Sequence, residues 1–149
     1  MSQPGMPQET VAAVQAALGA EHAALWVYGL VSAFLPAAYD KALREGVAEH
    51  RERRDATAEL LAAAGITPAP AEAAYVPPEP VEDEASAAKL VATAETDATV
   101  AWRAVLERCD DKALRESALA ALTQSAIRAT RWRLAAGSDA AVPSFPGQP

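Results

Sequence analysis

Cysteine, aromatic residues and positive charge are all scarce in this chain, and each shortage argues against a class of protein. The single cysteine, Cys109, cannot form an internal disulfide, which is typical of a reducing compartment. The 20 acidic residues outnumber the 13 basic ones and leave a formal net charge of −7. That balance argues against general electrostatic binding to nucleic acid or to an anionic membrane.

Long apolar runs are missing as well. No stretch approaches the roughly 20 uncharged apolar residues that a membrane span requires, and the longest candidate, residues 23–38, lies inside a helical pattern. The first ten residues, MSQPGMPQET, have neither a basic start nor an apolar centre, so we expect no secretory signal. These features predict a cytoplasmic protein that binds neither membrane nor nucleic acid. Cys109 is expected to be a small buried residue rather than a reactive thiol.

The apolar content consists largely of alanine. Hydrophobic residues make up 51% of the chain but aromatic residues only 5%, which favours helices packed closely on small side chains over a sheet with a core of large residues. Gly19, Gly29 and Gly46 interrupt the helical patterns and are expected to mark close helix crossings.

Proline is concentrated in one stretch, residues 65–84, with the sequence GITPAPAEAAYVPPEPVEDE. Such a segment favours an extended backbone that covers about 3 Å per residue, so it can reach more than about 40 Å. A helix of about 25 residues is roughly 37 Å long. The stretch can therefore run the length of a helical bundle, and we expect it to start the second half from the end where the first half began. Tyr75 is expected to pin it to the bundle.

The fold predicted from these patterns is an all-α four-helix bundle made of two antiparallel helical hairpins joined by one long crossover. The expected segments are a flexible N-terminus at 1–8, helices at about 9–38, 40–64, 84–109 and 111–136, the crossover at 65–83, and a C-terminal tail at 138–149. The two halves also match at a constant spacing, which indicates a duplicated hairpin. The matched pairs are Glu21 with Glu95, Tyr28 with Trp102, His50 with Gln124, and Arg54 with Arg128.

Charged residues occupy positions on the helical seams where apolar residues are expected. Glu21 and Glu95 lie on the seams of the first and third helices, and His50 and Arg54 lie one turn apart on the seam of the second. A charge on a buried face is costly unless it is paired or binds a metal. Counted from the helix ends, these residues lie at similar depth. The sequence therefore predicts a polar layer in the middle of the bundle.

The predicted bundle, with carboxylates facing inward from its first and third helices, resembles the ferritin-like superfamily over residues 10–136. More narrowly, four features resemble a bacterial family of ferritin-like domains with unassigned function. They are EHAALWVYG at 21–29, EHRERRDA at 49–56, AAYVPPEPVED at 73–83, and Glu95.

That resemblance implies a specific pattern of metal ligands. Superfamily members that bind iron carry a Glu on each of helices one and three and a Glu-x-x-His on each of helices two and four. This chain keeps Glu21, Glu95 and His50, but Val47 stands where the Glu of helix two would be. In helix four the corresponding positions hold Ala121 and Gln124. An incomplete carboxylate shell does not suit a dinuclear site.

Two functional interpretations follow. In the first, the bundle is a metal-free homodimeric structural or interaction module with no catalytic residues and no cofactor, and the arginines replace the metal cations by bridging the carboxylates. The expected buried network comprises Glu21, His50, Arg54, Glu95, Gln124 and Arg128. In the second, Glu21, His50 and Glu95 form an iron or manganese site with a reduced number of ligands, in an oxidoreductase or metal-handling protein. A third, weaker interpretation is a small apolar ligand bound beside Tyr28 and Trp102.

Overall fold

The computed structural model describes residues 5–139 and 143–149, and within them the secondary structure is entirely helical. The elements are α1 (Gln8–Val31), a short 3₁₀ helix (Ala37–Tyr39), α2 (Asp40–Ala63), α3 (Glu84–Glu107) and α4 (Lys112–Ala135). The predicted all-α four-helix bundle is confirmed. Among the described helices, none is long and apolar enough to cross a membrane.

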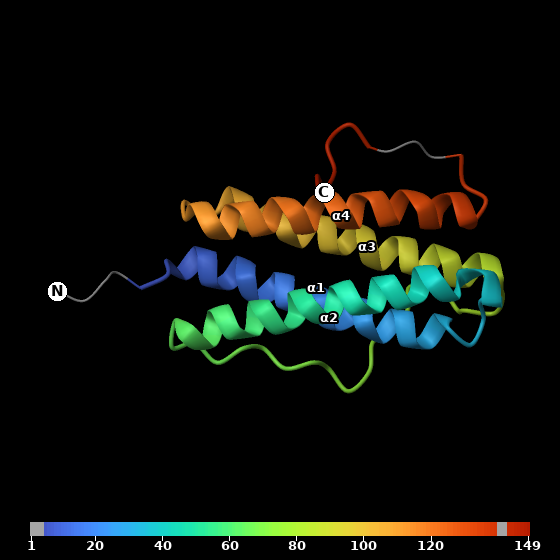
Figure 1. Ribbon diagram of the computed structural model, residues 1–149, viewed down its shortest axis with the longest axis horizontal. Helices are drawn as coiled ribbons and strands as arrows, with labels where there is room; N and C mark the ends of the chain where they lie inside the picture. Colours follow the sequence, from blue (N-terminus) through green and yellow to red (C-terminus); the bar gives the residue numbers. More distant parts are fainter. Residues whose placement is uncertain (1–4, 140–142) are drawn as a thin grey trace.

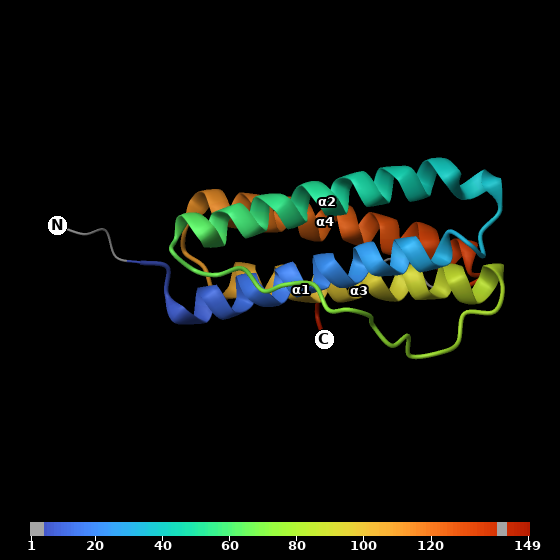
Figure 2. The same ribbon diagram turned by 90° about the horizontal axis from the view of Figure 1, so that it is seen from below.

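The four helices lie side by side along one long axis, as two hairpins (Figure 1). Helix α1 packs against α2 and α3, and α3 packs against α4. The segment between α2 and α3 runs along the outside of the bundle, as Figure 2 shows. It begins at the end where α1 starts and delivers the chain to the opposite end. The expectation that the second half starts where the first began is therefore wrong, and α3 runs antiparallel to α1.

Side-chain caps start the helices of the second hairpin. The Asp83 carboxylate accepts a hydrogen bond from the backbone N–H of Ser86, and the Ser86 hydroxyl accepts one from the N–H of Asp83, which forms a capping box before α3. The Asp111 carboxylate accepts from the N–H of Leu114 before α4. Gly65 and Gly137, with φ of 77° and 84°, end α2 and α4 in the left-handed region.

The first helix is shorter than the sequence predicted. Helix α1 ends at Val31 instead of continuing to residue 38. Pro36 has no N–H to donate and disfavours helical backbone at Leu35, so the chain leaves the helix and enters the short Ala37–Tyr39 turn before α2. Leu35 remains buried because this connection packs against the end of the core.

The predicted crossover is held to α1. The rings of Trp26 and Tyr75 lie 5.8 Å apart between centroids, which confirms that Tyr75 pins the segment. Closer to α2, the ring Nε2 of His22 lies 3.0 Å from the carbonyl oxygen of Ala69. Of the tail, residues 143–149 return to α3, where Gly147 is buried against Thr99 and Arg103. Residues 1–4 of the predicted N-terminus and 140–142 of the predicted tail lie outside the described residues.

One of the three helical glycines marks a close helix crossing. A Cβ atom at Gly46 of α2 would lie 2.6 Å from the hydroxyl oxygen of Tyr28 in α1, so only glycine admits the tyrosine ring there. Gly19 and Gly29 have no neighbouring atom within 4 Å of such a Cβ, and the expectation is wrong for these two. Gly46 thus determines where Tyr28 lies.

Two apolar clusters fill the bundle on either side of a polar layer. One includes Val31, Leu43 and Val91, and the other includes Val14 and Leu18. Glu21, His50 and Glu95 lie between them and are fully buried. The fold therefore places three titratable side chains in the middle of its core.

Candidate polar site in the bundle core

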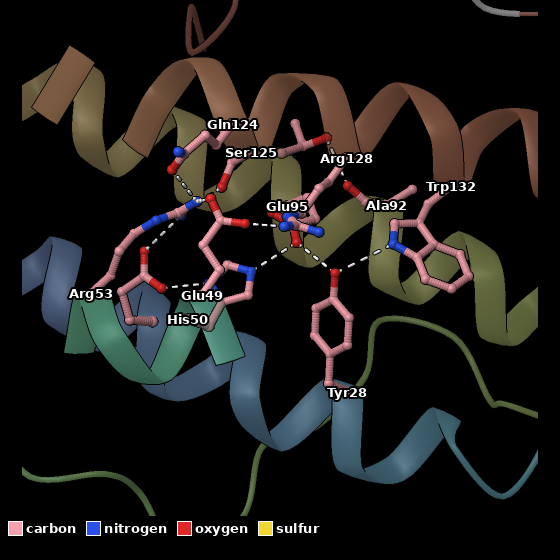
Figure 3. Close-up of polar contacts among 12 residues, drawn as sticks. Tyr28, Glu49, His50, Arg53, Ala92, Glu95, Gln124, Ser125, Arg128 and Trp132 are labelled. Atoms are coloured by element: carbon pink, nitrogen blue, oxygen red, sulfur yellow. Dashed lines mark hydrogen bonds and ion pairs between the residues drawn. The ribbon is translucent and has the colours of Figure 1, made fainter. Parts of the chain in front are cut away.

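The centre of the site is His50, whose two ring nitrogens both contact carboxylates. Its Nδ1 lies against Oε2 of Glu21, and its Nε2 lies 2.7 Å from Oε1 of Glu95. Figure 3 shows the imidazole reaching from α2 toward Glu95 on α3. The side chains of all three residues are 0% exposed. Helices α1, α2 and α3 are thus joined through one imidazole ring.

This geometry favours the imidazolium form. A carboxylate accepts hydrogen bonds but has none to donate, so each ring nitrogen of His50 must carry a proton. Burial lowers the pKa of His50, but the hydrogen bonds and negative charges of Glu21 and Glu95 outweigh it and raise that pKa to about 9. For Glu21, burial raises the pKa. Its contacts with His50, Arg53 and Trp102 outweigh burial and hold the pKa of Glu21 below its ordinary value.

Each carboxylate also accepts a hydrogen bond from an aromatic residue of the other hairpin. The indole Nε1 of Trp102 donates to Oε1 of Glu21 at 2.8 Å, and the hydroxyl of Tyr28 donates to Oε1 of Glu95 at 2.7 Å. Tyr28 matches Trp102, and Glu21 matches Glu95, in the internal comparison of the two halves. The reciprocal pattern supports a duplicated hairpin.

The hydroxyl of Tyr28 is held in its protonated form. Burial and the charge of Glu95 raise the pKa of Tyr28 far above its ordinary range. The indole Nε1 of Trp132 on α4 donates to the same hydroxyl at 3.3 Å. Tyr28 and Trp102 are therefore occupied by the polar network, and this arrangement does not favour the apolar-ligand interpretation.

Arg53, and not Arg54, is the arginine of α2 that joins this network. Its Nη1 donates to Oε1 of Glu21 at 3.3 Å and to Oγ of Ser125 at 2.9 Å. Arg54 instead donates through Nε to its neighbour Asp55, and a third of its side chain is exposed. The prediction for Arg54 is therefore wrong.

The error has a physical cause in the spacing of α2. The buried positions of this helix run through Leu43, Gly46, His50, Thr57 and Leu61. Because Gly46 has no side chain, it gives no hydrophobic signal, and the apolar pattern alone favours the neighbouring Val47 and, seven residues further on, Arg54. From Gly46 the three-and-four spacing reaches 50 and 53, which turns Arg53 inward.

The α4 residues of the expected network lie nearer the surface. Gln124 is exposed, contrary to the prediction, although its Oε1 accepts from Nη2 of Arg53 at 3.3 Å. Arg128 is partly buried and donates through Nη2 to Oε2 of Glu49. Ser125, beside Gln124, is the fully buried polar residue of α4.

Glu49, like Arg53 and Ser125, is a member of the site that the sequence pattern did not predict. Its two oxygens accept from Arg53 and Arg128. Glu49 lies in the charged run EHRERRD, where it is hard to tell from a solvated residue. Its four-residue spacing from Arg53 was the available signal.

Formal charges within the network balance. Glu21, Glu49 and Glu95 contribute three negative charges, and the imidazolium of His50 with Arg53 and Arg128 contributes three positive ones. Three buried atoms have no hydrogen-bond partner among the described residues: Oε2 of Glu95, Nε of Arg53 and Nε of Arg128. The arrangement can hold protons and orient helices, and it has unused donors on both guanidinium groups.

A family model described as a domain of unknown function, DUF4439, matches residues 13–149. The chain belongs to this family. It is also similar to Rv2844, a conserved hypothetical protein from Mycobacterium tuberculosis, whose crystal structure matches with a TM-score of 0.84 at 38% sequence identity. The match covers 93% of this chain and 97% of that one. No curated protein matches the chain. Neither description names an activity, and the function of this DUF4439 protein depends on its site and not on its fold.

The residues of this DUF4439 chain do not provide the ligand set of an iron-binding ferritin-like protein. Glu21, His50 and Glu95 do converge, but an imidazole that donates from both nitrogens has no lone pair for a metal. Val47 and Ala121, at the positions of the missing glutamates, offer no ligand atom. Within the described ranges, no group of three or more His, Cys, Asp or Glu side chains has the arrangement of a metal site.

The neighbouring arginines of α2 provide a matched test of the network. Arg53→Ala is expected to lower the free energy of unfolding by about 1.5–3 kcal/mol, because it removes charge-assisted hydrogen bonds from the buried Glu21. Arg54→Ala should change it by no more than about 0.5 kcal/mol, as for other surface substitutions. Urea denaturation of both variants measures the difference. Equal losses would show that Arg53 has no special role.

Proposed function

We propose that this protein is a metal-free ferritin-like bundle that acts as a structural or interaction module. In this proposal the protonated His50 takes the position between the carboxylates of α1 and α3 that metal ions hold in the iron-binding members of the superfamily. The observation that carries it is the pair of contacts from the two ring nitrogens of His50 to Glu21 and Glu95. No catalytic residue or cofactor is part of the proposal.

A network of this kind suits a module whose task is a fixed shape. Buried charged groups contribute little net stability, because desolvation offsets their attraction. They can instead set the axial register of helices, since a helix that slides by one turn leaves its charge unpaired. The layer made by Glu21, His50, Glu95 and Arg53 draws on α1, α2 and α3, and Ser125 adds α4. It would therefore hold all four helices in one alignment.

Elemental analysis tests this proposal. Protein purified without chelators is expected to contain iron, manganese and zinc well below one atom per chain. Stoichiometric content of any of them would contradict it. A Glu49→Gln variant is the control, because it alters a carboxylate outside the Glu21, His50 and Glu95 group. Metal retained by that variant and lost by Glu21→Gln would place the ion at the core.

The second candidate is a metal-handling or oxidoreductase function with an iron or manganese site that has a reduced number of ligands. Two observations favour it: Glu21, His50 and Glu95 converge, and Oε2 of Glu95 has no partner among the described residues. Binding would require His50 to release a proton, so affinity should rise with pH. Glu21→Ala would then abolish uptake of added manganese, and uptake that survives this substitution would exclude the site.

A cytoplasmic homodimer that binds neither nucleic acid nor membrane is the assembly we propose for this module. The acidic composition of the chain supports the part of this proposal that concerns nucleic acid and anionic membranes. The molar mass in solution tests the dimer directly. A mass of one chain at micromolar concentration would contradict it.

A further inference from the structure

A groove separates α2 from α4 along the middle of the bundle. These two helices do not pack closely as the other neighbouring pairs do, and polar side chains connect them. A cavity of about 450 Å³ opens on this face, bounded by Arg53 and Ala56 from α2 and by Ala120, Ala121 and Gln124 from α4. Arg53 is the most buried charged side chain of its lining, with 10% exposed.

Two guanidinium groups share the carboxylate of Glu49. Glu49 and Arg53 line this groove, whereas Arg128 borders a separate cavity with Tyr39 and Trp132. Oε1 of Glu49 accepts from Nη2 of Arg53 at 3.2 Å, and Oε2 accepts from Nη2 of Arg128. The side chain of Glu49 is 19% exposed, and among the described residues the two arginines are its hydrogen-bond and ion-pair partners. Figure 3 shows Glu49 lying between the two arginines.

The two arginines have donor capacity that Glu49 does not use. A guanidinium offers five N–H donors, yet Arg128 donates to Glu49 through Nη2 alone among the described residues. Its Nε and the Nε of Arg53 are both buried without an acceptor. Buried donors without acceptors are costly, and a flat two-oxygen anion can satisfy a guanidinium fork in bidentate fashion.

We propose that the groove between α2 and α4 binds a small aliphatic carboxylate, and that Glu49 is a built-in competitor that occupies the two-arginine clamp when the ligand is absent. Glu49 would turn toward solvent and uncover Arg128, which does not line the cavity while it is paired with Glu49. The ligand carboxylate would then bind Arg53 and Arg128. A short aliphatic chain would lie against Ala56, Ala120 and Ala121, which line the cavity.

The surroundings of the clamp favour a single negative charge. Glu52 also borders the cavity, and the whole chain carries a net charge of −7, so sulfate or phosphate would meet more repulsion than a monocarboxylate. The alanine lining has no donors for additional oxygens, whereas it can cover methylene groups. This site lies outside the Glu21, His50 and Glu95 group and does not depend on whether a metal binds there.

The test is a titration with sodium butyrate, with sodium chloride and sodium sulfate at matched ionic strength as reference salts. Binding is followed by two-dimensional NMR at constant pH. Residues that line the groove are expected to show chemical-shift changes that saturate as the butyrate concentration rises. Glu49→Gln should tighten binding by at least about tenfold, because an intramolecular competitor is removed. Arg128→Lys should weaken it about tenfold or more, since lysine lacks the guanidinium fork.

The controls make the result decisive. Arg131→Lys, at an exposed position of the same helix, should leave butyrate binding unchanged. Lack of saturable butyrate binding in a folded Glu49→Gln variant would overturn the proposal, and so would equal shifts with chloride or sulfate. Should Glu49→Gln fail to fold, the wild type decides: butyrate binding that Arg128→Lys weakens supports the site, and binding that it leaves unchanged, or none at all, overturns it.

Discussion

His50→Leu is expected to lower the free energy of unfolding by about 3–5 kcal/mol, the cost of breaking a buried ion pair by removing one partner. Leucine fills much of the space but leaves Glu21 and Glu95 facing each other across an apolar side chain. Both carboxylates are fully buried, and Arg53 contacts Glu21 alone of the two. Glu95 must therefore ionise without a cationic partner or bind a proton. Urea denaturation of the variant and the wild type measures the loss through the midpoint and the slope.

A triple variant separates the loss of charge pairing from the loss of packing. In Glu21→Gln/His50→Leu/Glu95→Gln, neutral amides replace the two carboxylates. The amide oxygens can still accept hydrogen bonds from Trp102 and Tyr28. This variant should recover most of the stability that His50→Leu loses. If the single variant does not fold and the triple variant does, the prediction is met. A single variant within about 1 kcal/mol of the wild type would be too stable for a buried ion pair.

Alkaline pH is expected to destabilise the protein well before lysine or tyrosine residues titrate in solution. The pKa of His50 is raised from its ordinary value of 6.5 to about 9, so the native state binds this proton more tightly than the unfolded state does. The contribution is fully present below about pH 6.5 and is lost as pH rises through about 9. By linkage it amounts to about 3 kcal/mol.

At acid pH the free energy of unfolding changes with pH in the opposite direction. Because the pKa of Glu21 is lowered in the native state, its contribution is present above its ordinary value and is lost as pH falls below it. Urea denaturation at a series of pH values should therefore show greatest stability between about pH 5 and 6.5.

Two variants assign the alkaline limb to one residue. His50→Gln should be less stable overall and lack the decline between pH 6.5 and 9, whereas His22→Gln should keep it. An alkaline decline that persists in His50→Gln would have to come from another group. Such a result would remove the imidazolium from the explanation of stability.

Local chemistry accounts for the part of the fold that the sequence predicted. The predicted helix boundaries next to Asp83, Asp111, Gly65 and Gly137 need no tertiary contact, because these residues cap the helices through their neighbours in sequence. The position of Glu21 and Glu95 on apolar seams likewise depends only on helical periodicity. The convergence of the two carboxylates with His50 follows from their similar depth in antiparallel helices.

Other features depend on contacts between distant segments, and periodicity cannot supply them. Periodicity places Arg54 instead of Arg53 on the inner face of α2 because Gly46, which faces the core to admit Tyr28, carries no apolar side chain. The donors Trp102 and Tyr28 reach carboxylates on the opposite hairpin, and only the internal match between the halves hints at this exchange. Glu49 joins Arg128 across the gap between α2 and α4, so its role depends on how far apart those helices lie.

Nitrogen-15 NMR of the imidazole ring is the most direct test of the central claim that a proton-bearing His50, with no metal, joins Glu21 to Glu95. In protein labelled at histidine and held at neutral pH, both ring nitrogens of His50 should be protonated, and added zinc should leave their resonances unchanged. A ring nitrogen of His50 that lacks a proton at neutral pH, or that shifts to a metal-bound position when zinc is added, would contradict the account.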